Sequence, residues 1–380
     1  MTLKATWPGA TLLIVLSSLA MGGMAWALRP ALTSSDDLTR RLEEVALFVA
    51  GADPYQDPDM TYPPSAPPVF TALLAPVPES LVRPYWIVLN LIALGVCCAV
   101  LVNVWGRDWP RWLQAATALA LVATKPARGG IALGQFHLMP VGLGLAATCL
   151  TVERPVLAGI LMGIALIKPT MVLPLVLLWT IRRRWNALLG AGAVQAGLWL
   201  VTSIWVRIDP ITLGREWVAL ASGQEAAGMI DWPSLIGQVW PTTSGLTLPV
   251  ALVCLMVAGG LFWAFRHRDD RDLVPIACFV AAVFTYHRPY DLVLLFPALV
   301  WFIDRAWKER YRSLVPTLLA STLAIALIWP SHPSVTGSFE FLYAPIFVPL
   351  AHVMGTILVF EVAREGRAIG DFKPLARSAG

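Results

Sequence analysis

Long runs of apolar residues, separated by short polar segments, follow one another along most of this chain. The first run extends from Gly9 to Leu28 and contains no charged residue. About 20 apolar residues, each adding about 1.5 Å of helix, cross the hydrocarbon core of a bilayer. The pattern therefore predicts about ten to twelve membrane-crossing helices. The predicted spans are residues 9–28, 84–104, 112–124, 132–151, 155–167, 170–181, 186–206, 246–265, 273–286, 289–303, 313–329 and 341–360.

The composition agrees with a chain that lies mostly in lipid. Hydrophobic residues make up 57% of the 380 residues and charged residues 14%, whereas soluble domains have about 45–50% and about 25%. This balance argues against a soluble enzyme, and no separate soluble domain is visible between the runs. We predict an all-α polytopic membrane protein that forms one domain over residues 1–380, with the first run retained as a signal-anchor helix.

The charged residues orient the predicted helices. With the N-terminus inside and twelve crossings, most of the 28 lysines and arginines lie at the inner ends of the spans. The positive-inside rule assigns such ends to the cytoplasm, so both termini are predicted to be cytoplasmic. The net charge of +4 then reflects contact with anionic membrane lipids, and no nucleic-acid partner is expected.

Two long connecting segments, at about residues 29–83 and 207–245, lie on the outer side in this topology. Long loops beside a compact bundle usually carry function. In the first, Ser34 stands three residues before an aspartate, which is a helix-start signal, and Gly51 ends the helical pattern. We predict an amphipathic helix lying along the outer membrane surface. Its apolar face is Leu38, Leu42, Val45 and Val49, and its polar face is Asp37, Arg40, Arg41 and Glu44.

A proline-rich run from Tyr62 to Pro68 follows this helix. Proline lacks a backbone N–H and has a fixed φ, so closely spaced prolines favour an extended chain. The run predicts a stiff, non-helical crossover.

Ionisable residues gather at the outer ends of the predicted spans, where such groups are costly and tend to be functional. The foremost carboxylates are Asp36 and Asp37 in the first outer segment. Cations hold phosphate or pyrophosphate leaving groups, and a carboxylate deprotonates an attacking hydroxyl. The combination suits sugar transfer from a phosphate-linked lipid. The cationic candidates are Lys125, Arg128, Lys168, His287 and Arg288, and His137 lies just inside a span.

Most of these residues also have a purely structural interpretation. Asp36 and Asp37 suit the first turn of a helix, and Lys125 and Arg128 suit interface anchors that extend their charges to water. Lys168, which precedes a proline between two apolar runs, is harder to explain in this way and favours phosphate binding.

Two further pairs of residues have candidate roles. Asp291 would serve as a counter-ion for Arg288, and Asp57 with Asp59 has the spacing of a metal-binding pair. That spacing is common by chance, and the five cysteines form no Cys-x-x-Cys motif. We therefore expect neither a metal nor a cofactor.

An ordered set of short motifs resembles the GT-C class glycosyltransferases of family 87, which are similar to polyprenol-phosphate-mannose-dependent mannosyltransferases of actinobacteria. No single motif is specific, but their order and the topology together cover about residues 30–300. The motifs are a surface helix with aspartate, Gly51-x-Asp53-Pro54-Tyr55, Tyr62-Pro63-Pro64, Gly134-Gln135, Lys168-Pro169, Trp232 through Gly237, and His287 through Pro297.

The resemblance implies a GT-C-like bundle and a catalytic aspartate about fourteen residues before the glycine that follows the surface helix. Counting back from Gly51 gives Asp37. Asp36 is the fallback, because Leu38 follows Asp37 where the family usually has an aromatic residue. The predicted donor-phosphate set is Lys125, Arg128, Lys168, His287 and Arg288. The predicted substrate contacts are Tyr55, Tyr62, Gln135 and His137, the last standing where the family tends to carry Asn.

We therefore predict an inverting, metal-independent transfer of a sugar, mannose by resemblance, from a polyprenyl-phosphate donor to a glycolipid or glycan acceptor. The reaction is expected on the outer face of a bacterial inner membrane. One alternative is a transporter or flippase of an anionic lipid-linked substrate, although transporters more often show internal repeats and midplane charges. Another is a non-catalytic membrane scaffold, which leaves the clustered outer cations unexplained.

Overall fold

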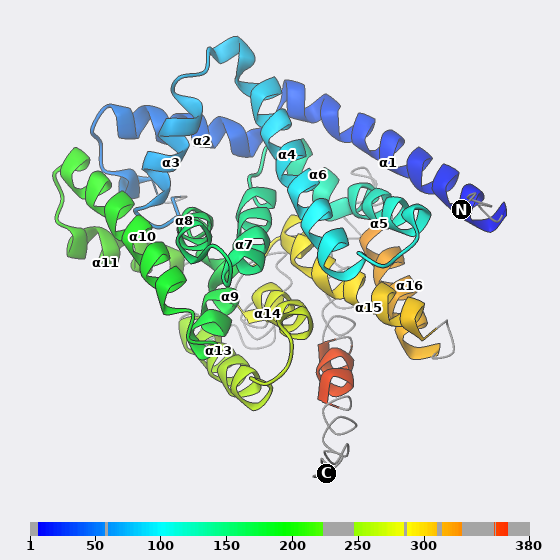
Figure 1. The fold of residues 1–380 in the computed structure, drawn as a ribbon. Helices are drawn as coiled ribbons and strands as arrows, with labels where there is room; N and C mark the ends of the chain where they lie inside the picture. Colours follow the sequence, from blue (N-terminus) through cyan, green and yellow to red (C-terminus); the bar gives the residue numbers. More distant parts are fainter. Residues whose placement is uncertain are drawn as a thin grey trace, which may run out of the picture.

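The computed structural model describes residues 7–57, 60–222, 247–284, 287–309, 314–328, 353 and 355–363. Within these residues the regular secondary structure is helical and no strand occurs. Figure 1 shows the helices gathered side by side, with α2 and α3 at one end of the assembly. The prediction of an all-α protein is confirmed.

Three helical segments are long and apolar enough to cross a membrane, namely Ala10–Val49, Glu79–Trp105 and Trp185–Val206. The first combines α1 (Trp7–Thr33) with α2 (Asp36–Val49), and because α2 is rich in charged residues, the apolar part is α1. The other two are α4 and α10. Shorter apolar helices accompany them. These findings support a membrane protein, whereas ten to twelve crossings remain a prediction, and most of the predicted span 341–360 lies outside the described residues.

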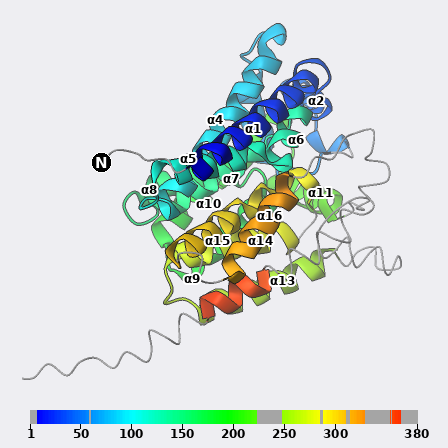
Figure 2. The ribbon, with the colours of Figure 1, turned by 90° about the vertical axis from the view of Figure 1, so that its right-hand side faces the viewer.

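The remaining elements follow the sequence order closely. On the side of α2 they are η1 (Pro54–Gln56), α3 (Ala66–Leu74) and α11 (Pro210–Ser222). In the bundle they are α5 (Arg111–Ala123), α6 (Lys125–Leu133), α7 (Leu138–Leu150), α8 (Pro155–Ala165), α9 (Pro169–Ile181), α13 (Thr247–Ala264), α14 (Asp270–Phe284), η3 (Pro289–Leu295), α15 (Phe296–Lys308) and α16 (Leu314–Ile328). The view in Figure 2 shows α1 running along α5 and α6.

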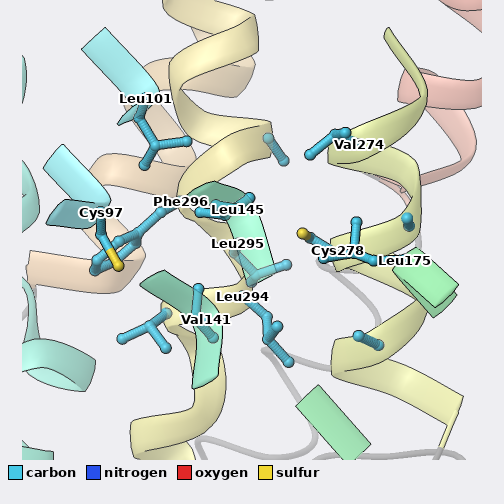
Figure 3. Packing of buried hydrophobic residues seen from close by; sticks show 14 of the residues in the cluster. Cys97, Leu101, Val141, Leu145, Leu175, Val274, Cys278, Leu294, Leu295 and Phe296 are labelled. Atoms are coloured by element: carbon cyan, nitrogen blue, oxygen red, sulfur yellow. The ribbon is translucent and has the colours of Figure 1, made fainter. Parts of the chain in front are cut away.

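The main core lies between α4, α7, α9, α14 and α15. In Figure 3, Cys278 of α14 lies beside Leu175 of α9, and Cys97 of α4 lies near Phe296 of α15. Both thiols are buried and act as small packing groups.

Small residues let α8 and α10 approach closely. A Cβ added to Gly159 would lie 2.6 Å from the carbonyl oxygen of Ala187, and one added to Gly163 would lie 2.6 Å from Val194. Glycines spaced four residues apart allow such backbone contact between membrane helices. This contact fixes α10, whose far end reaches the segments around α2.

Three local predictions are corrected. The proline-rich run is not wholly non-helical, because α3 begins at Ala66, and Pro67 and Pro68 occupy its first turn, where a missing N–H costs nothing. An additional helix, α6, occupies the connection between the spans predicted at 112–124 and 132–151. The faces of α2 are also not divided as predicted: Arg41 and Glu44 are buried, whereas Val49 is 50% exposed.

Candidate active site

Helix α2 is held at both ends by side chains of the long helices. At its start, Nη1 of Arg83 in α4 donates a hydrogen bond to Oγ of Ser35 over 2.6 Å. At its end, Nε1 of Trp205 in α10 donates to the carbonyl oxygen of Phe48 over 2.6 Å. These bonds fix the position of Asp37, which stands in the first turn of the helix.

A turn at Gly134 packs closely against the start of α2. Gly134 ends α6 with φ +74°, and a Cβ there would lie 2.7 Å from Cβ of Leu38. Its carbonyl oxygen accepts a 2.7 Å hydrogen bond from Nε1 of Trp86, a buried residue of α4. The turn therefore fixes the position of the start of α2 and of the next residue in the chain, Gln135, which lines the pocket described below.

The irregular chain between η1 and α3 is fixed through its carbonyl groups. Nε1 of Trp217 in α11 donates to the oxygen of Thr61 over 3.0 Å, and the Tyr55 hydroxyl donates to the oxygen of Tyr62 over 3.0 Å. The hydroxyl of Thr202 in α10 donates to the oxygen of Pro64. The segment is thus ordered by tertiary contacts, and Tyr62 is presented to the pocket.

Lys168 and Asp291 form a buried ion pair on the opposite wall. Lys168 immediately precedes Pro169, which separates α8 from α9 because a residue before proline disfavours the helical conformation. Its Nζ lies 2.6 Å from Oδ1 of Asp291, and both side chains are at most 10% exposed. Oδ2 of Asp291 lies 3.2 Å from Nδ1 of His287 and accepts the backbone N–H of Arg288 over 3.3 Å. The carboxylate of Asp291 thus contacts Lys168 with one oxygen and His287 with the other.

These elements enclose one polar pocket. Its lining includes five of the predicted site residues: Asp37, Tyr62, Gln135, Lys168 and Arg288. The other lining residues are Arg40, Arg41, Thr61, Tyr290 and Asp291. The space among them is about 570 Å³, counting the open mouth.

The two carboxylates of the pocket differ in their partners. Asp291 is 3% exposed and has the three contacts given above. Asp37 makes no ion pair and no side-chain hydrogen bond within the described residues. Asp37 is therefore the carboxylate whose oxygens remain available to a bound hydroxyl.

The tyrosines near the pocket are hydrogen-bond donors rather than bases. Burial raises the pKa of the Tyr62 phenol, with Glu44 and Asp37 adding to the effect and Arg41 opposing it. Burial also raises the pKa of Tyr55. Both hydroxyls stay protonated at neutral pH.

The other predicted site residues lie behind or away from the lining. His287 and His137 are fully buried, and the ring of His137 lies 5.4 Å from that of Tyr290. Asp36 is exposed beside Asp37. The hydroxyl of Tyr55 is used to hold the backbone of Tyr62.

Two predicted phosphate ligands belong to α6. Lys125 is its first residue and is absent from the pocket lining. Arg128 packs against α1, where a Cβ on Gly23 would lie 2.5 Å from its Cδ. Nε of Arg128 donates to the carbonyl oxygen of Thr124 over 3.3 Å. The observed contacts of Arg128 are therefore those of a residue joining two helices.

The sequence did not single out Arg41, Thr61 or Tyr290 as site residues. For Arg41 a signal exists, because it follows Asp37 by four residues and therefore shares its helix face. No group of three or more potential metal ligands occurs in the described part of the chain, and Asp59 of the considered metal pair lies outside that part.

The fold and the pocket together define a helical membrane protein with a charged, polar site. A sequence profile of glycosyltransferase family 87 matches residues 60–297, more than half of the chain. The chain belongs to this family and is a membrane glycosyltransferase. The match begins after Asp37, and the motif from Trp232 to Gly237 lies within it but outside the described residues. Neither the curated proteins nor the solved structures contain a match to the chain.

Proposed function

We propose that the protein transfers a sugar from a polyprenyl-phosphate donor to a hydroxyl group of a lipid or glycan acceptor, with Asp37 as the general base. The observation that supports this most directly is the placement of Asp37, which has no ion-pair partner within the described residues, in the same pocket as Lys168 and Arg288. The resemblance suggests mannose as the sugar. The topology suggests the outer face of a bacterial inner membrane.

The chemistry balances with these residues alone. The oxygen of the acceptor hydroxyl attacks the anomeric carbon of the donor sugar while Asp37 accepts the proton of that hydroxyl. The bond from that carbon to the phosphate oxygen breaks on the opposite face, so the configuration inverts. The polyprenyl phosphate leaves with one more negative charge, which Lys168 and Arg288 stabilise.

The wider set suggested by the sequence remains part of this proposal. His287 supports the site through Asp291, and Tyr62 and Gln135 face the sugar. Within the described part of the chain the amide oxygen of Gln135 is buried without a hydrogen-bond partner, as expected for a group that meets a substrate hydroxyl. The structure offers weaker support for Lys125 and Arg128, which do not line the pocket, and the transfer step proposed here does not require them.

The test uses purified protein, labelled polyprenyl-phosphate mannose and a membrane lipid extract. Wild type is expected to form new labelled glycolipid. Replacing the base, in Asp37→Asn, should lower the rate by about 10²–10⁴-fold, whereas Asp36→Asn should retain activity. Full transfer by Asp37→Asn would refute the assignment of the base. Movement of the donor between leaflets without any product would indicate the flippase alternative.

A further inference from the structure

Arg41 of α2 packs against an aromatic cluster, one member of which, Tyr62, lines the pocket. It is 6% exposed, and its Nη1 forms an ion pair with Oε2 of Glu44, which is equally buried. Its Cζ lies 4.5 Å from the ring centroid of Tyr62 and 5.7 Å from that of Phe70. A buried arginine is costly unless its charge is matched and its plane is stacked, so both contacts are needed to keep it there.

The aromatic cluster connects Arg41 to the opposite wall. Tyr62 and Phe136 have ring centroids 5.1 Å apart, and Phe70 lies 4.7 Å from Phe136. Nζ of Lys168 lies 5.9 Å from the ring of Phe136. Two cations, Arg41 and Lys168, each paired with a buried carboxylate, therefore contact the same group of rings.

We propose that Arg41 is a positioning residue, anchored by Glu44, that holds Asp37 and Tyr62 in their working orientation. Asp37 and Arg41 are one helical turn apart on the same face of α2, so clamping Arg41 on Tyr62 also fixes the rotation of α2 about its axis. The carbonyl of Tyr62 is already held by Tyr55, and Arg41 fixes its ring. A displacement of about 1 Å in such a group lowers a reaction rate by about 10²-fold.

The alternative role for this ion pair is to anchor α2 to the rest of the protein without affecting the reaction. The two roles differ in what they change. An anchor affects unfolding, and a substrate ligand affects KM. A positioning residue affects kcat, and it does so together with the residue that holds it.

The experiment compares Arg41→Lys, Glu44→Gln and their double variant. The matched control is Glu43→Gln, which makes the same chemical change on an exposed neighbour of Glu44. The inference rests on the proposed transfer reaction, so kcat and KM are measured with labelled polyprenyl-phosphate mannose. Hydrogen–deuterium exchange of α2 is measured without substrate.

Both single variants are expected to lower kcat by about 10-fold or more, with KM changed less than about twofold, and to speed exchange in α2. The double variant should be little worse than either single one, because the two residues act as a unit. Glu43→Gln should match wild type in both measurements.

Three results would overturn the inference: unchanged kcat with lower unfolding temperature, a raised KM with unchanged kcat, or unchanged exchange in α2. Absence of transfer by wild type has a different meaning. If exchange in α2 still responds to Glu44→Gln and not to Glu43→Gln, the anchoring of Arg41 by Glu44 is supported and the proposed transfer reaction is the part that fails.

Discussion

Breaking the buried ion pair between Lys168 and Asp291 should strongly destabilise the protein. Loss of Asp291 should lower the free energy of unfolding more than loss of Lys168. The atoms are 2.6 Å apart, which corresponds to an attraction of about 6 kcal/mol at an effective dielectric constant of about 20, before the cost of removing both charges from water. Removing one partner of a buried pair typically costs about 3–5 kcal/mol. Asp291→Leu should reach this range, because it removes the carboxylate partner of Lys168 and leaves the longer contacts with the rings of Tyr290 and Phe136, at 5.4 and 5.9 Å.

Lys168→Met should cost less, about 2–3 kcal/mol, because Asp291 keeps its contacts with His287 and the Arg288 amide. The double variant should be about 3 kcal/mol more stable than the sum of the single effects predicts. The assay is denaturant unfolding in detergent, followed by tryptophan fluorescence. Lys308→Met is the matched control, since Lys308 also lies 2.6 Å from a carboxylate but is 54% exposed, and its loss should cost about 0–1 kcal/mol. A cost for Lys168→Met no larger than this control, or single effects that simply add, would refute the reasoning.

Two glycine substitutions, each compared with a control substitution at another glycine, test the packing and the site separately. Gly159→Ala should destabilise the protein by about 1–3 kcal/mol, because its Cβ would lie 2.6 Å from a backbone oxygen of α10. Gly192→Ala, with nothing within 4 Å, should not, and equal unfolding midpoints would refute the packing role. Gly134→Ala and Gly51→Ala carry similar strain, at φ +74° and +75°, of about 1–2 kcal/mol. Only Gly134→Ala also displaces Leu38 in α2, so it alone should lose most transfer activity in the labelled-donor assay; equal activity of the two variants would contradict the placement of α2.

The local signals along the chain predicted the helices well. The start signal before Asp37 and the stop at Gly51 place α2 within one residue of its observed start and two of its observed end. The long apolar runs predicted α4 and α10 because their composition alone decides between helix and loop. The end of the span predicted at 112–124 agrees with the end of α5 at Ala123, but helix α6 was missed, since the lysine and proline at its start look like an ordinary loop.

The assembly of the site required information that no local pattern carries. Lys168 and Asp291 are 123 residues apart in the chain, and the sequence suggested Arg288 as the partner of Asp291. The orientation of α2 posed a different problem. An amphipathic pattern shows that Arg41 and Glu44 share a face, but it does not distinguish a face turned to water from one turned to a polar pocket.

The distribution of charge suits the proposed reaction, in which one pocket holds both a phosphate and a general base. The lining has four cations and two carboxylates, and two of those cations, Arg41 and Lys168, already have buried carboxylate partners. A carboxylate clamped between cations accepts a proton poorly. Because Glu44 and Asp291 satisfy the buried cations, Asp37 is not drawn into an ion pair with them. In the proposed reaction the donor phosphate would meet Arg288 at the exposed rim and the Lys168–Asp291 pair beneath it, and Asp37 would keep its lone pairs for the acceptor hydroxyl. On this argument the buried pairs serve the reaction by keeping the base free.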